Sequence, residues 1–506
     1  MMLSITYTRA AIGVEAPLVS VEVHLSNGLP ALALVGLPEA TVKEARERVR
    51  SALINCGFTF PARRITVNLA PADLPKEGGR YDLPIAIAIL AASEQIASDK
   101  LGQYEFLGEL ALTGAVRGVQ GAIPAAMAAI AAKRKLILSS DNQSEAGLLQ
   151  HGSCLLSAEL LEICAFLNNQ AELKSAHSPP QAAFSRQGDL LDIIGQQQAK
   201  RALEITAAGG HNLLLIGPPG TGKTMLASRL PGLMPPLSDH EALESAAIAS
   251  LVNGEDIQRQ WRQRPFRAPH HTSSRYALVG GGSLPKPGEI SMAHNGILFL
   301  DELPEFERKT LDALREPIEA GVICLSRARA RVIYPARFQL VAAMNPSPTG
   351  HYSGPHNRST PQQTLRYLSR LSGPFLDRFD LSLEVPLLPP GTLSNTPTCS
   401  ESSETVRRRV HEARARQLAR SGMINQALGP DDIKRVCHIS QGDARWLEEV
   451  LNRLGLSVRA WQRILKVART IADVAGEEKI QREHLHEALS YRAIDRLLIH
   501  LQKNLS

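Results

Sequence analysis

Residues 217–224 have the sequence Gly-Pro-Pro-Gly-Thr-Gly-Lys-Thr, and the apolar stretch Asn212-Leu-Leu-Leu-Ile216 comes directly before them. Glycines at this spacing let backbone N–H groups converge on phosphates, while Lys223 supplies a positive charge and Thr224 a hydroxyl that can hold Mg²⁺. We expect the segment 225–230 to be the helix whose N-terminal end faces the phosphates. The pattern predicts an α/β fold with a parallel sheet that binds a nucleoside triphosphate. The predicted phosphate contacts are Gly217, Pro218, Pro219, Gly220, Thr221, Gly222, Lys223 and Thr224.

Two more apolar runs end in polar side chains. Residues 296–300 are typical of a central parallel strand buried on both faces, and Asp301 and Glu302 follow them. We expect Asp301 to hold Mg²⁺ and Glu302 to orient and deprotonate the attacking water. Residues 338–344 form a third run that ends in Asn345, which is suited to fixing the same water. Polar groups after three parallel strands predict a nucleotide site at one edge of the sheet.

With these motifs, several other strings resemble the AAA+ ATPases, and within them the magnesium-chelatase-like group that includes the ComM (YifB) family. The resemblance spans nearly the whole chain. The strings that carry it are Ile194-Gly-Gln196, Arg264-Pro-Phe-Arg-Ala-Pro-His-His271, Gly288-Glu-Ile-Ser-Met-Ala-His-Asn-Gly296, Tyr334-Pro-Ala-Arg-Phe338, Met344-Asn-Pro-Ser-Pro348 and Gly373-Pro-Phe-Leu-Asp-Arg-Phe-Asp380.

The resemblance implies that the cofactors are ATP and Mg²⁺ and that further residues act on them. The implied roles are Gly195 and Gln196 near the adenine, Asn345 as the first sensor, Arg378 as the arginine finger and Arg459 as the second sensor. Arg370 is a competing candidate for the finger. A finger that acts on a neighbouring subunit requires a ring, so the resemblance also implies a homo-hexamer.

Composition sets the broad class of the protein. A chain of 506 residues suggests about three domains. Its six cysteines form no Cys-x-x-Cys pair, and its longest apolar runs fall short of the roughly 18 residues that a membrane span needs. We therefore expect a cytoplasmic protein with no zinc site and no membrane partner. The net charge of +6 favours an anionic partner but is spread over a long chain.

Arg327, Arg329 and Arg331 lie two apart, which on a strand would put all three side chains on one face. In the resembled group this position is a β-hairpin that points into the pore of the ring. The resemblance therefore implies contacts with the phosphates of single-stranded or branched DNA. The alternative is an exposed hairpin that its charges keep soluble.

A second insertion covers residues 261–288, where glycines and prolines favour loops and a hairpin over a helix. His270 and His271 are adjacent and are expected to point to opposite sides of an extended chain, with no carboxylate at metal-ligand spacing. This predicts no metal site. Contact with phosphates and contact with a neighbouring subunit both remain open for this loop.

Residues 1–172 are expected to form a separate α/β domain with a helix near residues 42–52, a strand at 65–69 and a buried helix at 83–92. The strings 75–82 and 108–114 resemble the proteolytic domain of Lon, which has a ribosomal-protein-S5-like fold. Arg80 stands where that family places its nucleophilic serine, and Ile123 stands where it places the partner lysine. The resemblance thus implies a non-proteolytic platform or DNA-binding collar, with Lys76, Arg80 and Arg117 as possible contacts.

Two stretches rich in Pro and Ser divide the rest of the chain. The predicted parts are a linker at 173–188, an AAA+ core at 189–390, a second linker at 391–404 and a helical lid at 405–506. The first lid helix carries many arginines, which we expect on a solvated face.

Three functions are compatible with these features. The resemblance to ComM implies a hexameric DNA motor, a helicase or branch-migration factor that promotes DNA integration in natural transformation and recombination. The alternative is a magnesium-chelatase-like ATPase that remodels a protein partner, but the chain has no Asp-x-Ser-x-Ser string, so no chelatase partner is evident. A protein unfoldase, or a scaffold that ATP assembles, is the third. The arginine-rich hairpin favours the DNA motor over an unfoldase.

Overall fold

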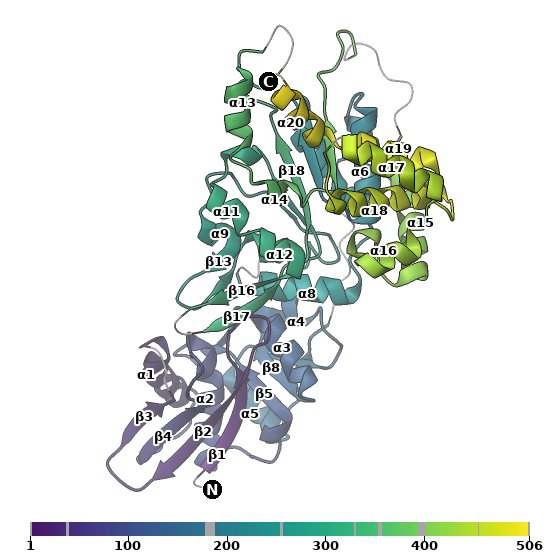
Figure 1. Cartoon of the computed structure of the whole chain (residues 1–506). Coiled ribbons are helices and arrows are strands. Elements are labelled where there is room, and N and C mark those ends of the chain that lie inside the picture. The colour runs from purple at the N-terminus through teal and green to yellow at the C-terminus, as the bar shows by residue number, and fades with distance from the viewer. Residues whose placement is uncertain are drawn as a thin grey trace.

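The computed structural model describes residues 3–36, 40–177, 188–252, 257–327, 330–352, 357–392, 401–453 and 455–503. An N-terminal α/β part, a central part built on a parallel sheet and a group of C-terminal helices beside that sheet follow one another (Figure 1). Among the described residues, no helix is long and apolar enough to cross a membrane.

Two four-stranded sheets and the helices packed with them form the N-terminal part. The first sheet has the strand order β1 (Leu3–Arg9), β2 (Leu18–Ser26), β4 (Arg64–Ala70), β3 (Ala31–Val35), and the second has β10 (Lys174–Ser175), β9 (Cys154–Ser157), β8 (Lys135–Ser139), β5 (Tyr104–Leu107). The other elements are β6 (Glu109–Leu110), β7 (Val116–Arg117), α1 (Ala40–Asn55), α2 (Asp82–Ala92), α3 (Ala122–Ala131), α4 (Gln143–Ala146) and α5 (Leu160–Leu167). The predicted strand at 65–69 lies in β4, and α2 is buried at every residue, as its apolar sequence predicts.

Two of the cations proposed as DNA contacts in this part are buried, so that expectation is wrong for them. Lys76 donates hydrogen bonds to backbone carbonyls, including that of Gly36 at 3.0 Å. Arg80 donates to the carbonyl of Gln120 and is 6% exposed. Burial lowers the pKa of both side chains. Because Lys76 and Arg80 satisfy carbonyls inside the fold, Arg117 is the one of these three candidates that is exposed and could meet a phosphate.

The central part is built on a five-stranded parallel sheet, ordered β12 (Phe266–Arg267), β15 (Ile297–Leu300), β18 (Gln339–Met344), β11 (Leu213–Ile216), β19 (Leu381–Glu384). Its helices are α6 (Gln197–Gly209), α7 (Lys223–Leu233), α8 (Asp239–Ser250), α9 (Arg275–Val279), α10 (Glu289–Met292), α11 (Arg308–Asp312), α12 (Arg315–Ala320), α13 (Pro361–Leu368) and α14 (Gly373–Leu376). Two hairpins, β13 (Gly280–Gly281) with β14 (Lys286–Pro287) and β16 (Val322–Ser326) with β17 (Arg331–Pro335), accompany it. Successive residues of β15, such as Leu298 and Phe299, belong to different apolar clusters, so the sheet is covered on both faces.

The C-terminal part consists of α15 (Ser403–Ser421), α16 (Pro430–Val436), α17 (Gln441–Arg453), α18 (Val458–Ala475), α19 (Arg482–Ser490) and α20 (Ala493–Lys503). The last helix leaves this group, because its apolar residues pack into the core of the central part beside α13 and β19. At the two predicted linkers, residues 178–187 and 393–400 lie outside the described residues. Residues 174–175 of the first linker form β10 instead of a linker.

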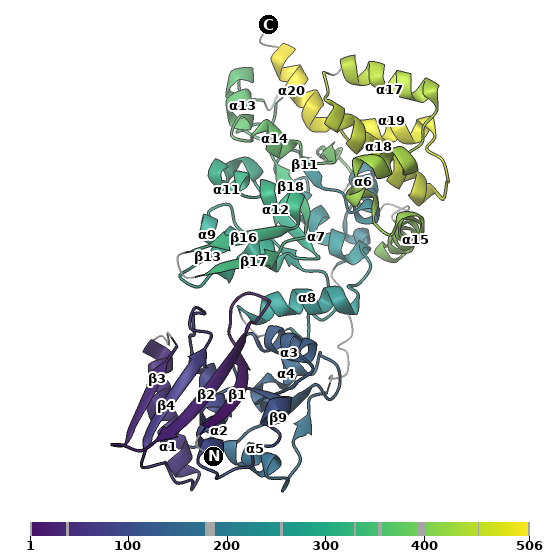
Figure 2. The ribbon, with the colours of Figure 1, turned by 60° about the horizontal axis from the view of Figure 1, so that its bottom comes forward.

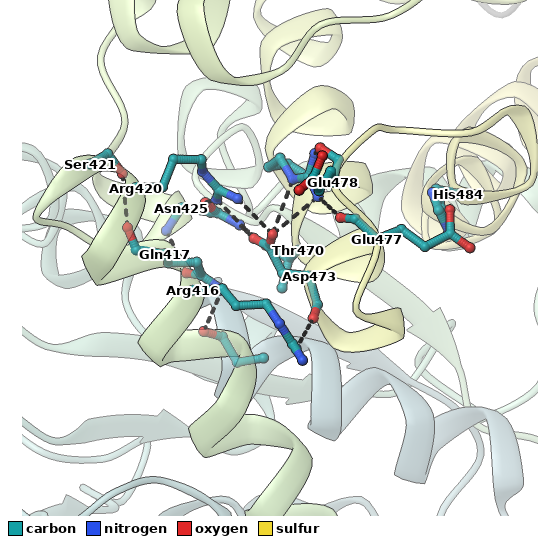
Figure 3. A network of polar contacts seen from close by, with 12 residues as sticks. Arg416, Gln417, Arg420, Ser421, Asn425, Thr470, Asp473, Glu477, Glu478 and His484 are labelled. Atoms are coloured by element: carbon teal, nitrogen blue, oxygen red, sulfur yellow. Dashed lines mark hydrogen bonds and ion pairs between the residues drawn. The ribbon is translucent and has the colours of Figure 1, made fainter.

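Several arginines of α15 are structural, which corrects the expectation of a solvated face. Arg409 pairs with Glu204 of α6 at 2.5 Å, and Arg414 is buried. Arg420 binds the buried carboxylate of Asp473 in α18 at 2.7 Å, and Asn425 donates to the same carboxylate (Figure 3). A carboxylate that holds several donors in the interior fixes the packing of α15 against α18.

Helix α8 lies between the N-terminal and the central part, where it packs against α3 and α10 (Figure 2). At the contact with α3, Gly121 N donates to the carbonyl of Ser250 at 2.8 Å. The hydroxyl of Ser250 donates to Glu145 Oε2 at 3.0 Å. Glu145 is 4% exposed, and this burial raises its pKa to about 7. The apolar residues of the junction are Ile123, Ala246, Ala247 and Ile257.

The junction is expected to be sensitive to pH. Because the folded-state pKa of Glu145 lies above its ordinary value, its contribution to stability is complete below that ordinary value and is lost as the pH rises through about 7. Between pH 6 and pH 8 the loss is on the order of 1 kcal/mol. Glu145→Gln keeps an acceptor oxygen but does not titrate, so its thermal unfolding temperature should fall less over this pH interval than that of the wild type.

The matched control is Glu483→Gln, the same substitution at an exposed position of α19. This variant should keep the pH dependence of the wild type. An identical pH dependence of unfolding in the wild type and in Glu145→Gln would show that Glu145 does not titrate in this interval.

Candidate active site

The loop at residues 217–224 connects β11 to α7, as its sequence predicts. Gly220 and Gly222 have φ values of +79° and +84°, which favour glycine, and α7 begins at Lys223. The Lys223 ammonium donates to the carbonyls of Gly217 at 2.7 Å and Pro218 at 2.8 Å. Burial lowers its pKa. The loop therefore encloses a positive charge beside the N-terminal end of a helix, which is an arrangement suited to a phosphate chain.

Polar groups from the other two strands meet this loop. The Thr224 hydroxyl donates to Asp301 Oδ2 at 2.6 Å, and Lys223 Nζ lies 3.3 Å from Asn345 Oδ1. The pairing of Ile216 with Met344 in neighbouring parallel strands brings these ends together. The predicted convergence of three strand ends at one edge is what the structure contains. A hydroxyl and a carboxylate in contact are oxygen donors of the kind that Mg²⁺ binds, so the site fits that ion.

Gly195 and Gln196 lie just before α6 and approach the same loop from the side of β19. Both have positive φ values, +65° and +53°. Gln196 Nε2 donates to the carbonyl of Pro386 at 2.8 Å. The neighbouring Val385 carbonyl packs so closely on Gly217 that a Cβ there would lie 2.3 Å from it. Residues 385–386, which follow β19, thus contact both Gln196 and the phosphate loop and place residues 195–196 beside that loop.

Glu302 is held by a residue that the sequence analysis did not connect with it. His271 Nδ1 lies 3.0 Å from Glu302 Oε2. Glu302 has φ +52°, a left-handed conformation that is uncommon outside glycine and is found at constrained sites. The expectation that the adjacent histidines point apart is wrong, because the rings of His270 and His271 lie side by side, with centroids 4.1 Å apart and planes tilted by 33°. The edge of the His271 ring also contacts Phe306.

The two finger candidates make ion pairs within their own chain. Arg378 pairs with Glu319 and its side chain is 12% exposed. Arg370 pairs with Glu305 at 3.0 Å and is 53% exposed. Arg370 is therefore the more accessible of the two, and Arg378 would have to leave Glu319 to meet a neighbouring subunit. Arg459, in the first turn of α18, is exposed and makes no hydrogen bond or ion pair within the described residues.

The arginine-rich segment forms the predicted hairpin, β16–β17, but its arginines do not line one strand. Ser326 pairs with Arg331, and Arg327 N donates to the carbonyl of Ala330 at 2.9 Å, so the turn lies between them. Arg327 and Arg331 therefore flank the tip of the hairpin, and both are exposed. Arg329 lies outside the described residues.

We expect the His271 contact to restrain Glu302. A carboxylate that is held by His271 must leave that contact before it can accept the proton of the attacking water, so loss of the pair should free it for proton transfer. His271→Ala should raise kcat for ATP hydrolysis by up to about fivefold, since a half-exposed pair is worth at most about 1 kcal/mol, and KM should not change. His271→Gln keeps a donor and serves as the control, with a rate near that of the wild type. A fall in kcat in His271→Ala would show instead that the pair positions Glu302 productively.

Comparisons with known proteins identify the family. The model described as "Magnesium chelatase, subunit ChlI" matches residues 189–393, "Subunit ChlI of Mg-chelatase" matches 21–142 and "Magnesium chelatase, subunit ChlI C-terminal" matches 400–492. The Escherichia coli protein YifB is 66% identical over the full length of both chains. Competence protein ComM of Haemophilus influenzae is 61% identical over 98% of this chain and 99% of its own. The magnesium-chelatase 38 kDa subunit of Cereibacter sphaeroides is 28% identical over 38% of this chain and 57% of its own. The chain therefore belongs to the family of YifB and ComM, which carries the domains of the magnesium-chelatase-like AAA+ proteins.

Proposed function

We propose that the protein is a hexameric DNA motor that hydrolyses ATP in the cytoplasm and acts as a helicase or branch-migration factor during the integration of transforming DNA. One observation above all supports this proposal. The side chains expected at an ATP site meet at one edge of the central sheet, here called the nucleotide edge, in a chain that is 61% identical, over almost its whole length, to a protein named for competence. The family itself suggests an ATPase.

The residues at the sheet edge divide the chemistry among them. The loop amides and Lys223 bind and neutralise the phosphates of ATP. Thr224 and Asp301 would hold Mg²⁺, which offsets further charge on the phosphates during transfer. Glu302 takes the proton of the attacking water, and Asn345, in contact with Lys223, orients that water beside the terminal phosphate.

DNA is the proposed partner because exposed cations gather at the β16–β17 hairpin. Arg327 and Arg331 flank its tip and pair with no carboxylate within the described residues. A backbone of phosphates supplies the complementary charge. The alternative is an ATPase that remodels a protein partner, and the family models described as magnesium chelatase subunits support it. The two magnesium chelatase subunits themselves, however, match only 38% and 30% of this chain.

We also propose that the N-terminal part is a Lon-like domain of the ribosomal-protein-S5 type that serves as a platform and not as a protease. Arg80 and Ile123 stand where the resembled protease has its serine and lysine, and both are buried. A buried guanidinium bound to backbone carbonyls cannot act as a nucleophile.

The motor is tested by the rate of ATP hydrolysis with and without single-stranded, duplex and four-way-junction DNA. The wild type should be stimulated by at least one of these DNAs. Lys223→Ala should lose nucleotide binding, because the phosphate charge is no longer neutralised. Glu302→Gln should bind ATP normally but slow its hydrolysis by roughly 100-fold or more, as expected for loss of a general base. Normal turnover in Glu302→Gln would exclude Glu302 as the base, and hydrolysis that no DNA alters would favour a protein partner.

The hexamer and the arginine finger are tested together by mixing inactive subunits. Arg378→Ala subunits mixed with Glu302→Gln subunits should recover part of the ATP hydrolysis, because an intact site then meets an intact finger across an interface. The control is a mixture of Lys223→Ala and Glu302→Gln subunits, in which every site is defective and no recovery is expected. Recovery with Arg370→Ala but not with Arg378→Ala would move the finger to Arg370.

A further inference from the structure

An open pocket of about 570 Å³ lies where the two hairpins of the central part meet. The β13–β14 hairpin and helix α9 form one side, and Arg327 at the tip of β16–β17 forms the other. The two views of the ribbon agree in placing α9, β13 and β16 side by side (Figures 1 and 2). A hydrogen bond links the two hairpins, because the Tyr334 hydroxyl of β17 donates to the carbonyl of Pro285, between β13 and β14, at 2.7 Å. The pocket is therefore a joint feature of both insertions.

Among the described residues that line this pocket, the charged ones are both cations and none is a carboxylate. Lys286 and Arg327 are exposed at its edge. Within the described residues, the Lys286 side chain makes no hydrogen bond or ion pair, and the Arg327 guanidinium donates to the carbonyl of its neighbour Ser326 and pairs with no carboxylate. Arg275, which is exposed and also without an ion pair in the described chain, precedes the aromatic residue of the pocket. These charges are available to an anion.

The aromatic residue is Tyr276, whose side chain is among the largest exposed apolar groups of the molecule at 64% exposure. Its ring lies against Gly281, where a Cβ would come within 2.5 Å of the ring. The Arg327 guanidinium lies over the same ring, 5.8 Å from its centroid. An exposed aromatic ring that is supported by backbone and shares a pocket with cations is the arrangement that proteins use to stack the bases of single-stranded nucleic acids.

We propose that this pocket binds single-stranded nucleic acid, with Tyr276 stacking on a base while Lys286 and Arg327 contact the flanking phosphates. The inference rests on the proposed function and deepens it, because it assigns the DNA contact to both hairpins and adds a base-stacking residue to the arginines. The carboxylates of an acidic peptide would pair with the two cations, but they would not use the exposed aromatic ring in the same pocket. The ring therefore favours a nucleotide base.

The pocket is tested by the fluorescence anisotropy of two labelled 30-nucleotide strands, one of thymidines and one with the same backbone but abasic sites, in the presence of a non-hydrolysable ATP analogue. The full-length wild type should bind the thymidine strand roughly fivefold or more tightly than the abasic strand, as expected for one stacked base. Tyr276→Ala should lose that advantage without weakening on the abasic strand, whereas Tyr276→Phe should keep it.

The cations are tested on the same strands between 50 and 200 mM salt. Lys286→Ala and Arg327→Ala should weaken binding to both strands and should each reduce the slope of log Kd against log salt by about one. The control is Arg453→Ala, which removes an exposed charge from α17 and should leave both the affinity and the slope unchanged.

Each other outcome identifies what has failed. If the wild type binds DNA but Tyr276→Ala binds both strands like the wild type, or weakens equally on both, the stacking role is wrong while the DNA motor stands. If the wild type binds neither strand, the proposed function and the pocket assignment fail together. If polyglutamate displaces the DNA from the wild type but has no effect on Lys286→Ala, the pocket takes an acidic protein instead.

Discussion

The buried parallel strands at the centre of the molecule determine where its chemistry is located. Because β11, β15 and β18 are parallel and covered on both faces, their register cannot shift without exposing apolar side chains. That register brings Thr224 to Asp301 across 77 residues of sequence, and Lys223 to Asn345 across 122. The contacts of Thr224 with Asp301 and of Lys223 with Asn345 therefore depend on the packing of the core. The proposed ATP hydrolysis, and with it the proposed DNA motor, depends on these contacts.

The segment between β12 and β15 offers a physical route from the nucleotide edge to the proposed DNA pocket. It leaves the sheet beside the nucleotide edge, places His271 on Glu302 and, five residues later, presents Tyr276 to the pocket. A ligand that moved α9 would pull on the histidine that holds the proposed base. Such coupling would let nucleic acid alter the rate of hydrolysis without contacting the phosphates. It needs only a small movement of one continuous segment.

Sequence reasoning was most successful where a motif and a periodicity agreed. The glycine-rich loop and the two apolar runs predict the strand ends that meet, because parallel strands leave little freedom of placement.

Prediction from the sequence failed where side chains are positioned by tertiary contacts. The arginines of α15 have the composition of a solvated face, yet their partners come from distant helices. The spacing of the three arginines predicts one strand, because nothing in the alternation indicates the turn between Ser326 and Arg331. The contact of His271 with Glu302 could not be predicted, since it depends on a loop that crosses from one strand end to another.

If ATP hydrolysis at the edge of the sheet drives DNA movement, strand exchange on a four-way junction should depend on it. Labelled junctions are incubated with ATP and either the wild type or Glu302→Gln, and the release of the labelled strand is followed in time. We expect ATP-dependent release by the wild type, with binding but no release by Glu302→Gln. Hydrolysis of ATP by the wild type on a bound junction with no strand movement would contradict it.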